Sequence, residues 1–529
     1  MRSIVLTGAV VASFVVFAGT AFAQKTGGIL KMYHRDNPPS LSIHEEATNS
    51  TVIPMMPVMS NLVIFDQSKP QNSPDDIVPD LAKSWSWSAD GKDLTFKLQE
   101  GVKWHDGKPF TAKDVVCTFD MLMGKSENKL RKNPRTSWYG NVDHVTADSD
   151  LQATVHLKRP QPSMLTLLAS GYSPIYSCHV PAAQMRTHPI GTGPFKFVEF
   201  KQKESIKLAR NPDYWKKGKP YLDGIEFTIV PNRGTAMLSF QSGRFDVTFP
   251  WEVTMPLLKD MKQQKPDANC VVTSMNNSTN LIINRDAPPF DSSGLRKALA
   301  LAIDRKAFID IINQGDAQQG GTMQPVKDGV WGMPEEMYAS IPGYGPDVAK
   351  NREQAREIMK KSGYGLDKHM KLKISTRGIS LYKDPAVILA GQLKEIWIDA
   401  DVDIIETAQW YPKIARKDYS VGLNTTGNGV DDPDQNFYEN FSCKSERNYT
   451  GYCNPEIEKL FDVQSQETDV AKRKKIVWEI DKQLLEDGAR PIIMWNRAAT
   501  CMQPYVKGIV PQVNSVYNGF RYEDAWLDR

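Results

Sequence analysis

The sequence predicts a mixed α/β protein with more than one domain. Residues 351–365 place Ala355, Ile358 and Met359 on one helical face, and residues 386–404 read as a helix followed by an alternating strand. Helix and strand in repeated succession favour α/β layers. A chain of 529 residues is too long for one compact core, so we expect two or three domains.

The first 23 residues predict a secretory signal. Arg2 precedes an apolar run from Ile4 to about Phe17, and small residues then lead to Ala23. This is the order of a cleaved signal peptide. The apolar run is shorter than the roughly 18–20 residues that span a membrane. We therefore expect cleavage near Ala23 and a soluble mature chain in an oxidising compartment.

A first strand is predicted over residues 28–33. His34 and Arg35 follow it, and His44-Glu45-Glu46 lies in the next polar segment. That triplet lacks the second histidine of the H-E-x-x-H motif, so it does not indicate a zinc protease.

The stretch GVKWHDGKPFTAKDV, residues 101–115, contains a His-Asp pair that could be catalytic, metal-binding or structural. Residues 94–99 alternate as a strand, GVKWH reads as a further short strand, and Asp106-Gly107 reads as a tight turn. Thr111 and Asp114 form a variant of the capping box that begins a helix. No partner nucleophile or third ligand is recognisable, so we interpret the pair as structural.

Six cysteines are present and none forms a C-x-x-C pair, which argues against zinc and thioredoxin chemistry. Cys443 and Cys453 flank a polar loop, and we predict a disulfide between them. The other four either pair as Cys117–Cys178 and Cys270–Cys501 or stay as buried thiols. The formal net charge of +3 is too small to indicate nucleic acid or a membrane surface as a partner.

Several further segments of the chain form a recognisable series. They are PDLAKSWSWSADGKDLTFKLQEGVKWHDGKPFTAKDV around the stretch above, and PIGTGPFKF, NPDYW, YLDGIEFTIVPN, APPFDSSGLRKALALAIDRKAF and ILAGQLKEIWIDADVDI further along. Together they resemble family 5 solute-binding proteins of ATP-driven (ABC) importers, the group with oligopeptide-, dipeptide- and nickel-binding members. The resemblance spans essentially the mature chain.

The resemblance implies a two-lobed periplasmic-binding-protein fold with a subdomain inserted in lobe I. Lobe I would comprise residues 24–61, 189–276 and 496–529, the inserted subdomain residues 62–188, and lobe II residues 277–495. A solute would bind in the cleft between the lobes of a periplasmic monomer. The complex would then deliver it to an ABC permease and its ATPase.

The resemblance also directs attention to a set of ligand-binding candidates. Trp410 and Tyr411 follow a strand where similar peptide binders place a tryptophan against the ligand, and such aromatics offer contact area with a polar tip. The full set of candidates is Trp410, Tyr411, Asn424, Thr425, Thr426, Asp431, Trp331, Trp495, His34 and Arg35.

The loop GNGVDDPDQNFYENF, residues 427–441, departs from the peptide-binding pattern. Peptide-binding members carry an Asp three residues before an acidic-Pro pair, where it holds the peptide ammonium, and here that position is Gly429. Three residues further back, where those members carry a tryptophan that lines the pocket, this chain has Thr426. We consider Asp431 as a replacement anchor, with a solvated loop acid as the alternative. The Asp432-x-Asp434-x-Asn436 spacing begins like a calcium loop, but Phe437 and Cys443 break that pattern.

These observations predict a binding protein that captures a peptide or peptide-like solute, without metal or cofactor. The alternatives are a non-peptide solute such as an opine, amine, sugar or metal chelate, a secreted hydrolase, or a receptor without a transported ligand. A hydrolase would need a nucleophile–base pair or a metal triad, and neither motif is found in the sequence.

Overall fold

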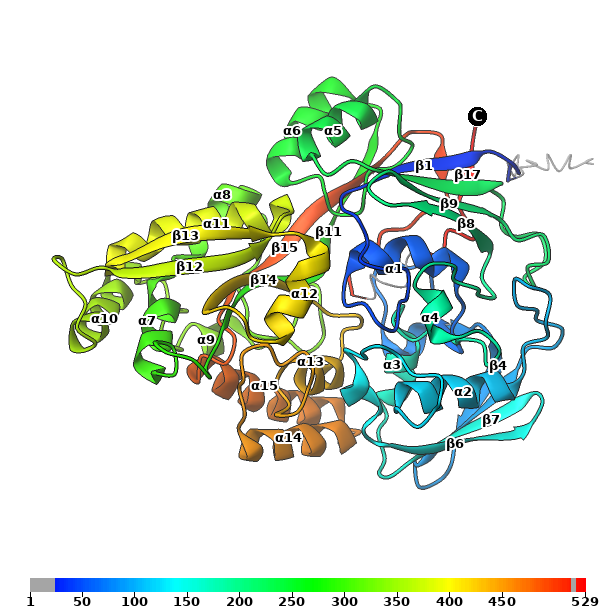
Figure 1. Cartoon of the computed structure of the whole chain (residues 1–529), viewed down its shortest axis with the longest axis horizontal. Helices are drawn as coiled ribbons and strands as arrows, with labels where there is room; N and C mark the ends of the chain where they lie inside the picture. Colours follow the sequence, from blue (N-terminus) through cyan, green and yellow to red (C-terminus); the bar gives the residue numbers. More distant parts are fainter. Residues whose placement is uncertain (1–23, 515–519) are drawn as a thin grey trace, which may run out of the picture.

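The computed structural model describes residues 24–514 and 520–529, and the predicted signal peptide lies outside these residues. Figure 1 shows two halves side by side, one containing the N-terminal third of the chain and the other most of the segment from β12 to α15. No helix in the described ranges is both long and apolar enough to cross a membrane.

One half contains a four-stranded sheet in the order β1-β10-β9-β8, in which β1 runs parallel to β10. A second four-stranded sheet, β4-β5-β7-β6, is antiparallel. The bounds of these strands are β1 (Ile29–His34), β4 (Ala82–Trp87), β5 (Asp93–Leu98), β6 (Val142–Ser149), β7 (Gln152–Leu157), β8 (Phe195–Lys201), β9 (Ser205–Arg210) and β10 (Gly224–Ile229).

The other half is organised around a five-stranded mixed sheet, in the order β13-β12-β14-β11-β15. β12 pairs in parallel with both β13 and β14, while β11 pairs antiparallel with β14 and β15. The bounds are β11 (Asn269–Ile283), β12 (Met370–Arg377), β13 (Ile398–Ile405), β14 (Val421–Gly427) and β15 (Ile492–Met502). Two-stranded pairs are formed by β2 (Val63–Phe65) with β3 (Ile77–Pro79), and by β16 (Val506–Lys507) with β17 (Trp526–Leu527).

The helices divide between the halves in chain order. The first half has α1 (Asn49–Met55), α2 (Ala112–Leu122), α3 (Met164–Leu168), α4 (Ala182–Met185), α5 (Arg233–Gln241) and α6 (Met255–Gln264). The second has α7 (Ser293–Ala302), α8 (Arg305–Asn313), α9 (Glu335–Tyr338), α10 (Val348–Lys361), α11 (Ser380–Leu393), α12 (Thr407–Ala415), α13 (Pro433–Asn440), α14 (Pro455–Gln466) and α15 (Val470–Glu486). Short 3₁₀ turns are η1 (Met56–Val58), η2 (Pro74–Asp76), η3 (Thr136–Tyr139) and η4 (Lys394–Ile396).

The long strands β11 and β15 run from one half into the other (Figure 1). At one end Ala499 and Met502 bridge to Val253 and Val247, in the core of the first half. At the other end Leu281 and Ile493 belong to the core of the second half. The pairing register shifts between Ser274 and Ser278, so the ladder is irregular where the strands change halves. The predicted lobe boundaries 276/277 and 495/496 fall within these strands, and the boundaries as such stay predictions.

The segment around His105 is architectural. Its backbone N–H donates to Gly191 O at 2.9 Å, and its Nε2 lies 3.0 Å from Gly193 O. Burial lowers the pKa of His105 to about 4, so the ring is neutral at pH 7. A Cβ at Gly191 would lie 1.8 Å from Val58 O, so only glycine fits that turn. The Thr111–Asp114 capping box is present at α2.

One local prediction in this segment was wrong. GVKWH, expected as a strand, forms only an isolated bridge between Lys103 and Pro109, because the chain turns back at Gly107, where φ is +89°. The predicted helix in 351–365 is α10, with Ala355 and Met359 buried and Gly363 just beyond its end.

All six cysteines are paired. The predicted bridge Cys443–Cys453 is formed, and the alternatives for the other four resolve to Cys117–Cys178 and Cys270–Cys501.

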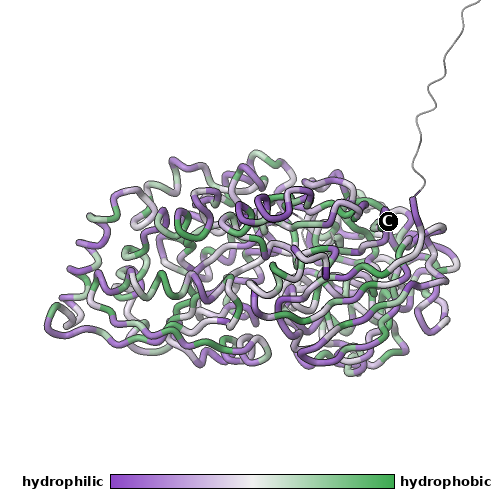
Figure 2. Tube along the Cα trace, turned by 90° about the horizontal axis from the view of Figure 1, so that it is seen from above, coloured by the Kyte–Doolittle hydropathy of each residue, from purple (hydrophilic) through white to green (hydrophobic). Residues whose placement is uncertain are grey.

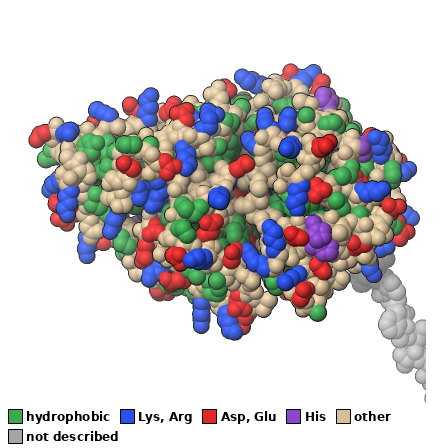
Figure 3. All heavy atoms as spheres, turned by 60° about the horizontal axis from the view of Figure 1, so that its bottom comes forward, with side chains coloured by type: hydrophobic (Ala, Val, Ile, Leu, Met, Phe, Trp, Pro, Cys, Tyr) green, Lys and Arg blue, Asp and Glu red, His purple; other side chains and the backbone are tan. Residues whose placement is uncertain are grey.

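The hydropathy of the trace in Figure 2 alternates along much of the chain, as half-buried strands and helices require. On the face drawn in Figure 3, Lys and Arg are interspersed with Asp and Glu.

Candidate functional site

A small cavity lies between the two halves, where the ends of several strands converge. We call it the inner cavity. In the described part of the chain it is lined by Arg35, Ala47, Asn49, Tyr172, Asn277, Arg377, Tyr382, Tyr411, Thr425, Gly427 and Arg447. Its volume of about 20 Å³ holds one or two waters, so the halves are drawn together and a larger solute requires them to move apart.

Arg377 ends β12 and is held on every side by acceptors from both halves. Its guanidinium pairs with Asp36 and donates to Thr407 Oγ1 at 2.5 Å and to Ser50 Oγ at 3.0 Å. Burial alone would lower the pKa of Arg377, but the Asp36 carboxylate raises it well above its usual range. This arginine is therefore a fixed positive charge that joins the two halves.

Arg35 follows β1 and shares the buried Glu252 with a second arginine. Arg35 Nη1 lies 2.8 Å from Glu252 Oε1, and Arg233 Nε lies 3.3 Å from Oε2. Burial alone would raise the pKa of Glu252, yet the two guanidinium groups keep it below its ordinary value. Arg35 lines the inner cavity, whereas Arg233 lines a separate hollow beside α11.

Glu439 on α13 forms a partition at one side of the inner cavity. One of its oxygens pairs with Arg447, and Oε2 accepts from Trp138 Nε1 at 2.8 Å. Trp138 also packs edge-on against Tyr172, with ring centroids 6.4 Å apart. Trp138 lines a larger hollow of about 630 Å³ on its other side, so the ring separates two spaces.

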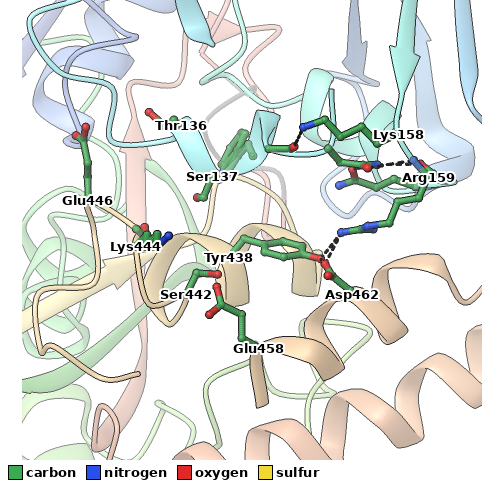
Figure 4. A pocket seen from close by; sticks show the side chains of 15 residues that line it. Thr136, Ser137, Lys158, Arg159, Tyr438, Ser442, Lys444, Glu446, Glu458 and Asp462 are labelled. Atoms are coloured by element: carbon green, nitrogen blue, oxygen red, sulfur yellow. Dashed lines mark hydrogen bonds and ion pairs between the residues drawn. The ribbon is translucent and has the colours of Figure 1, made fainter. Parts of the chain in front are cut away.

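We call the contact around that hollow the outer rim. It joins residues 136–163 to α13 and α14, and Figure 4 shows Arg159 directed at Tyr438 and Asp462. Arg159 Nη2 donates to Tyr438 Oη at 2.9 Å and pairs with Asp462. The remaining lining residues in the figure include Lys158, Lys444, Glu446 and Glu458.

Asp434 is the centre of the outer rim. Its carboxylate accepts from Gln161 and Ser163 of the first half, at 3.0 and 2.5 Å. It also accepts from Gln464, Ser465 and Arg473 of the second half, at 2.5, 2.6 and 3.4 Å. Arg473 makes a two-pronged pair with the neighbouring Asp432, at 2.8 and 3.1 Å. The two carboxylates therefore accept from arginine, amide and hydroxyl donors of the surrounding side chains.

The loop before α13 is packed tightly at Gly429. A Cβ there would lie 2.8 Å from Ser170 Oγ and 3.0 Å from Tyr172 Cδ2. Asp431 is buried, and one oxygen accepts from Val330 N at 2.7 Å while the other has no partner among the described residues. Burial raises the pKa of Asp431 to about 7.

Three of the ten predicted ligand-binding residues line the inner cavity: Arg35, Tyr411 and Thr425. The other seven lie elsewhere in the described structure. Trp410 is buried in a cluster with Ile282 and Ile414, and Trp495 donates to Gly321 O at 3.0 Å. Trp331 donates to Asp431 O at 3.0 Å.

The remaining predicted residues hold structure around the cavity. His34 Nε2 lies 3.0 Å from Ser50 O, Thr426 accepts from Asn280 and Arg490, and Asn424 is buried beside Thr426. The role of all ten in ligand binding stays a prediction.

The residues that the sequence interpretation did not include are Ala47, Asn49, Tyr172, Asn277, Arg377, Tyr382, Gly427 and Arg447. Arg377 had a usable signal, because it ends an alternating strand, and ligands gather at the carboxyl ends of parallel strands. Tyr172 and Arg447 lie in loops and carry no such signal.

Comparison with known proteins gives a consistent family. Residues 76–448 match the model of bacterial extracellular solute-binding proteins, family 5 Middle. The dipeptide-binding protein of Escherichia coli K12 is 26% identical over 473 residues, which cover 82% of this chain and 84% of that protein. The oligopeptide-binding protein OppA of Bacillus subtilis 168 is 26% identical over 467 residues, 83% of each chain.

Solved structures share the fold. The oligopeptide-binding protein AppA of Bacillus subtilis, in complex with a nonapeptide, superposes with a TM-score of 0.83 at 23% identity. The match covers 96% of this chain and 100% of that one. The two-lobed α/β fold predicted from the sequence is therefore confirmed.

Proposed function

Because this chain belongs to the bacterial extracellular solute-binding proteins of family 5, we propose that it captures a peptide or peptide-like solute for an ABC importer. The observation that carries the proposal is the inner cavity, whose walls come from both halves and include three arginines and three tyrosines. The named relatives bind dipeptides and oligopeptides, which supports the peptide class.

Capture would proceed by opening and closing of the halves about β11 and β15. A solute favours the closed state only through contacts that are better there than in the open state. Here those contacts would be to Arg35 and Tyr172 on one side and Arg377, Tyr411 and Arg447 on the other. The function requires no bond to be broken, and we propose no catalytic role.

We propose that the mature chain acts outside the cytoplasmic membrane, in the periplasm, after cleavage near Ala23. Its partners would be a membrane permease and that permease's ATPase. The three disulfides fit an oxidising compartment.

The test is to identify the solute that the protein carries. The exported protein is purified without unfolding, and native mass spectrometry compares its mass with that of the same sample after denaturation. We expect an extra mass that is released on unfolding and that fragments as a peptide or amide-linked acid. The refolded, solute-free protein is then titrated with that compound by calorimetry.

A protein that carries no solute, and that no peptide or peptide-like compound stabilises against heat, would contradict the proposed function. Binding to the native state alone raises stability by about 2.7 kcal/mol at 100 times Kd, so a true solute shifts the melting temperature measurably.

A further inference from the structure

The walls of the inner cavity are rich in cations and contain no acid. Arg35, Arg377 and Arg447 line it, and no Asp or Glu is among the lining residues in the described part of the chain. Each of the three arginines pairs with one carboxylate behind the wall, namely Glu252, Asp36 or Glu439.

Two further buried arginines lie close behind this wall and pair with no carboxylate of the described residues. Arg135 donates to the carbonyls of Ile43, His44 and Glu46, and its guanidinium lies 4.1 Å from the centre of the Tyr172 ring. Arg490 donates to Thr426 Oγ1 at 3.1 Å and to Arg447 O at 3.2 Å. The five arginines thus face three carboxylates, one of which is shared with Arg233.

Two of the wall arginines also have hydrogen-bond donors to spare. Arg35 Nε and Arg447 Nε are buried and have no acceptor among the described residues. A buried donor without an acceptor is costly, and an anionic oxygen is the acceptor that best compensates a guanidinium. An ammonium group in the same place would meet positive charge and no carboxylate.

We propose that the inner cavity selects a compact, peptide-like acid, held by its carboxylates and without need of a free amino group. This inference rests on the proposed function and names the solute class within it. We expect the partition formed by Trp138 and Glu439 to favour short solutes such as dipeptide acids, because a longer chain would have to displace it to extend into the larger hollow.

The inference is tested on the solute-free mature protein by calorimetry with matched acidic dipeptides. Each dipeptide is used in three forms: free, N-acetylated, and with its carboxyl groups converted to amides. We expect the N-acetylated acids to bind at least as tightly as the free forms, and the amides to bind at least about tenfold more weakly.

A pair of variants locates the effect. R35Q and R233Q each remove one arginine from Glu252 and leave the other as its partner, but only Arg35 lines the inner cavity. We expect R35Q to weaken binding of the acetylated acids about tenfold or more, and R233Q to change it less than about threefold. As a control for folding, the urea unfolding midpoints of both variants are measured and compared with that of the wild type.

Acetylation that abolishes binding, or amides that bind as well as acids, would overturn the inference and leave the proposed function intact. Equal losses in R35Q and R233Q would also overturn it. If no dipeptide form binds and no solute is carried through purification, both the inference and the proposed function fail.

Discussion

The inner cavity and the outer rim both join the two halves, but they do so with different chemistry. At the outer rim a single carboxylate, Asp434, has five donors from both halves around it. At the inner cavity three wall arginines and the two arginines behind them face three carboxylates, and two guanidinium nitrogens have no acceptor among the described residues. The Asp434 carboxylate has its donors without a solute, whereas two wall arginines of the cavity each have a donor left for one.

This difference indicates that the rim stabilises the contact between the halves and that the cavity selects the solute. The rim can hold the halves together through protein groups alone, so it sets how far the closed state is populated before a solute arrives. The cavity region also joins the halves, through the Arg377–Asp36 pair, and an entering acceptor would add to closure because the spare donors then gain a partner. Changes at the rim should therefore alter stability first, and changes at the cavity should alter solute selectivity.

The largest expected effect comes from breaking the rim at its centre. D434A leaves five donors without their acceptor in a buried place, and we expect a loss of about 3–5 kcal/mol in the free energy of unfolding. Urea unfolding followed by circular dichroism measures it. D462A is the control, because Asp462 is more than half exposed and should cost at most about 1 kcal/mol. Equal losses in the two variants would contradict the central role of Asp434.

A second prediction concerns Asp431, a buried acid that forms no ion pair with any residue the structure describes. The neighbouring Asp432, in contrast, pairs with Arg473. The folded-state pKa of Asp431, about 7, lies above the ordinary value, which is about 3.9. The native state therefore binds more protons than the unfolded state between about pH 4 and pH 7, and this group costs stability as pH rises through that window.

D431N should remove this cost, since the amide oxygen can still accept from Val330 N. We expect the variant to gain roughly 2–4 kcal/mol over the wild type at pH 8 and close to nothing at pH 4. Melting temperatures of both proteins across this range are the measurement. A gain that is the same at both pH values would show that the carboxyl is ionised or protonated alike in the folded and unfolded states.

A smaller loss of stability is expected when the partition formed by Trp138 and Glu439 is weakened. W138F keeps a ring against Tyr172 and Gly429 but removes the hydrogen bond to Glu439. We expect a loss of about 1–2 kcal/mol in stability and a relative gain in affinity for tripeptide acids over dipeptide acids. Calorimetry with the two lengths tests the gain, and an unchanged length preference would contradict the partition.

The smallest effect is expected at the exposed edge of the rim. R159A removes the pair with Asp462 and the bond to Tyr438, both close to solvent, so we expect at most about 1 kcal/mol. Repeating the measurement at high salt should shrink the effect further because exposed pairs are screened. A salt-independent loss would place this arginine in the buried network of Asp434 instead.

Local features of the fold were predictable because their causes lie close together in the chain. The Thr111–Asp114 box begins α2, Gly363 follows the end of α10, and Cys443 pairs across a short loop with Cys453. The short strand expected at GVKWH is reduced to a single bridge between Lys103 and Pro109, because the chain turns back at Gly107.

The site was predictable only in part, because its residues come from segments that lie far apart in the chain. Arg35 lies just after β1, Thr425 lies near the end of β14 and Tyr411 lies within α12, and the structure brings all three to the cavity. Trp410 has the same sequence context as Tyr411, yet neighbouring positions on a helix point in different directions. Both side chains belong to one hydrophobic cluster, but only Tyr411 also lines the inner cavity. Tyr172 and Arg447 come from loops whose course depends on the packing of both halves.

The sequence alone was sufficient to indicate the family, the α/β class and the start of α2 after Thr111. It also places Gly429 where the resemblance implies an ammonium-binding Asp, and that implication stays a prediction. These depend on motifs and on neighbours within a few residues. Only the tertiary structure decided what surrounds that glycine, which arginines keep spare donors and which carboxylates neutralise them. The reason is physical: charge balance in a buried site is summed over groups hundreds of residues apart, such as Asp36 and Arg377, and only folding brings them into contact.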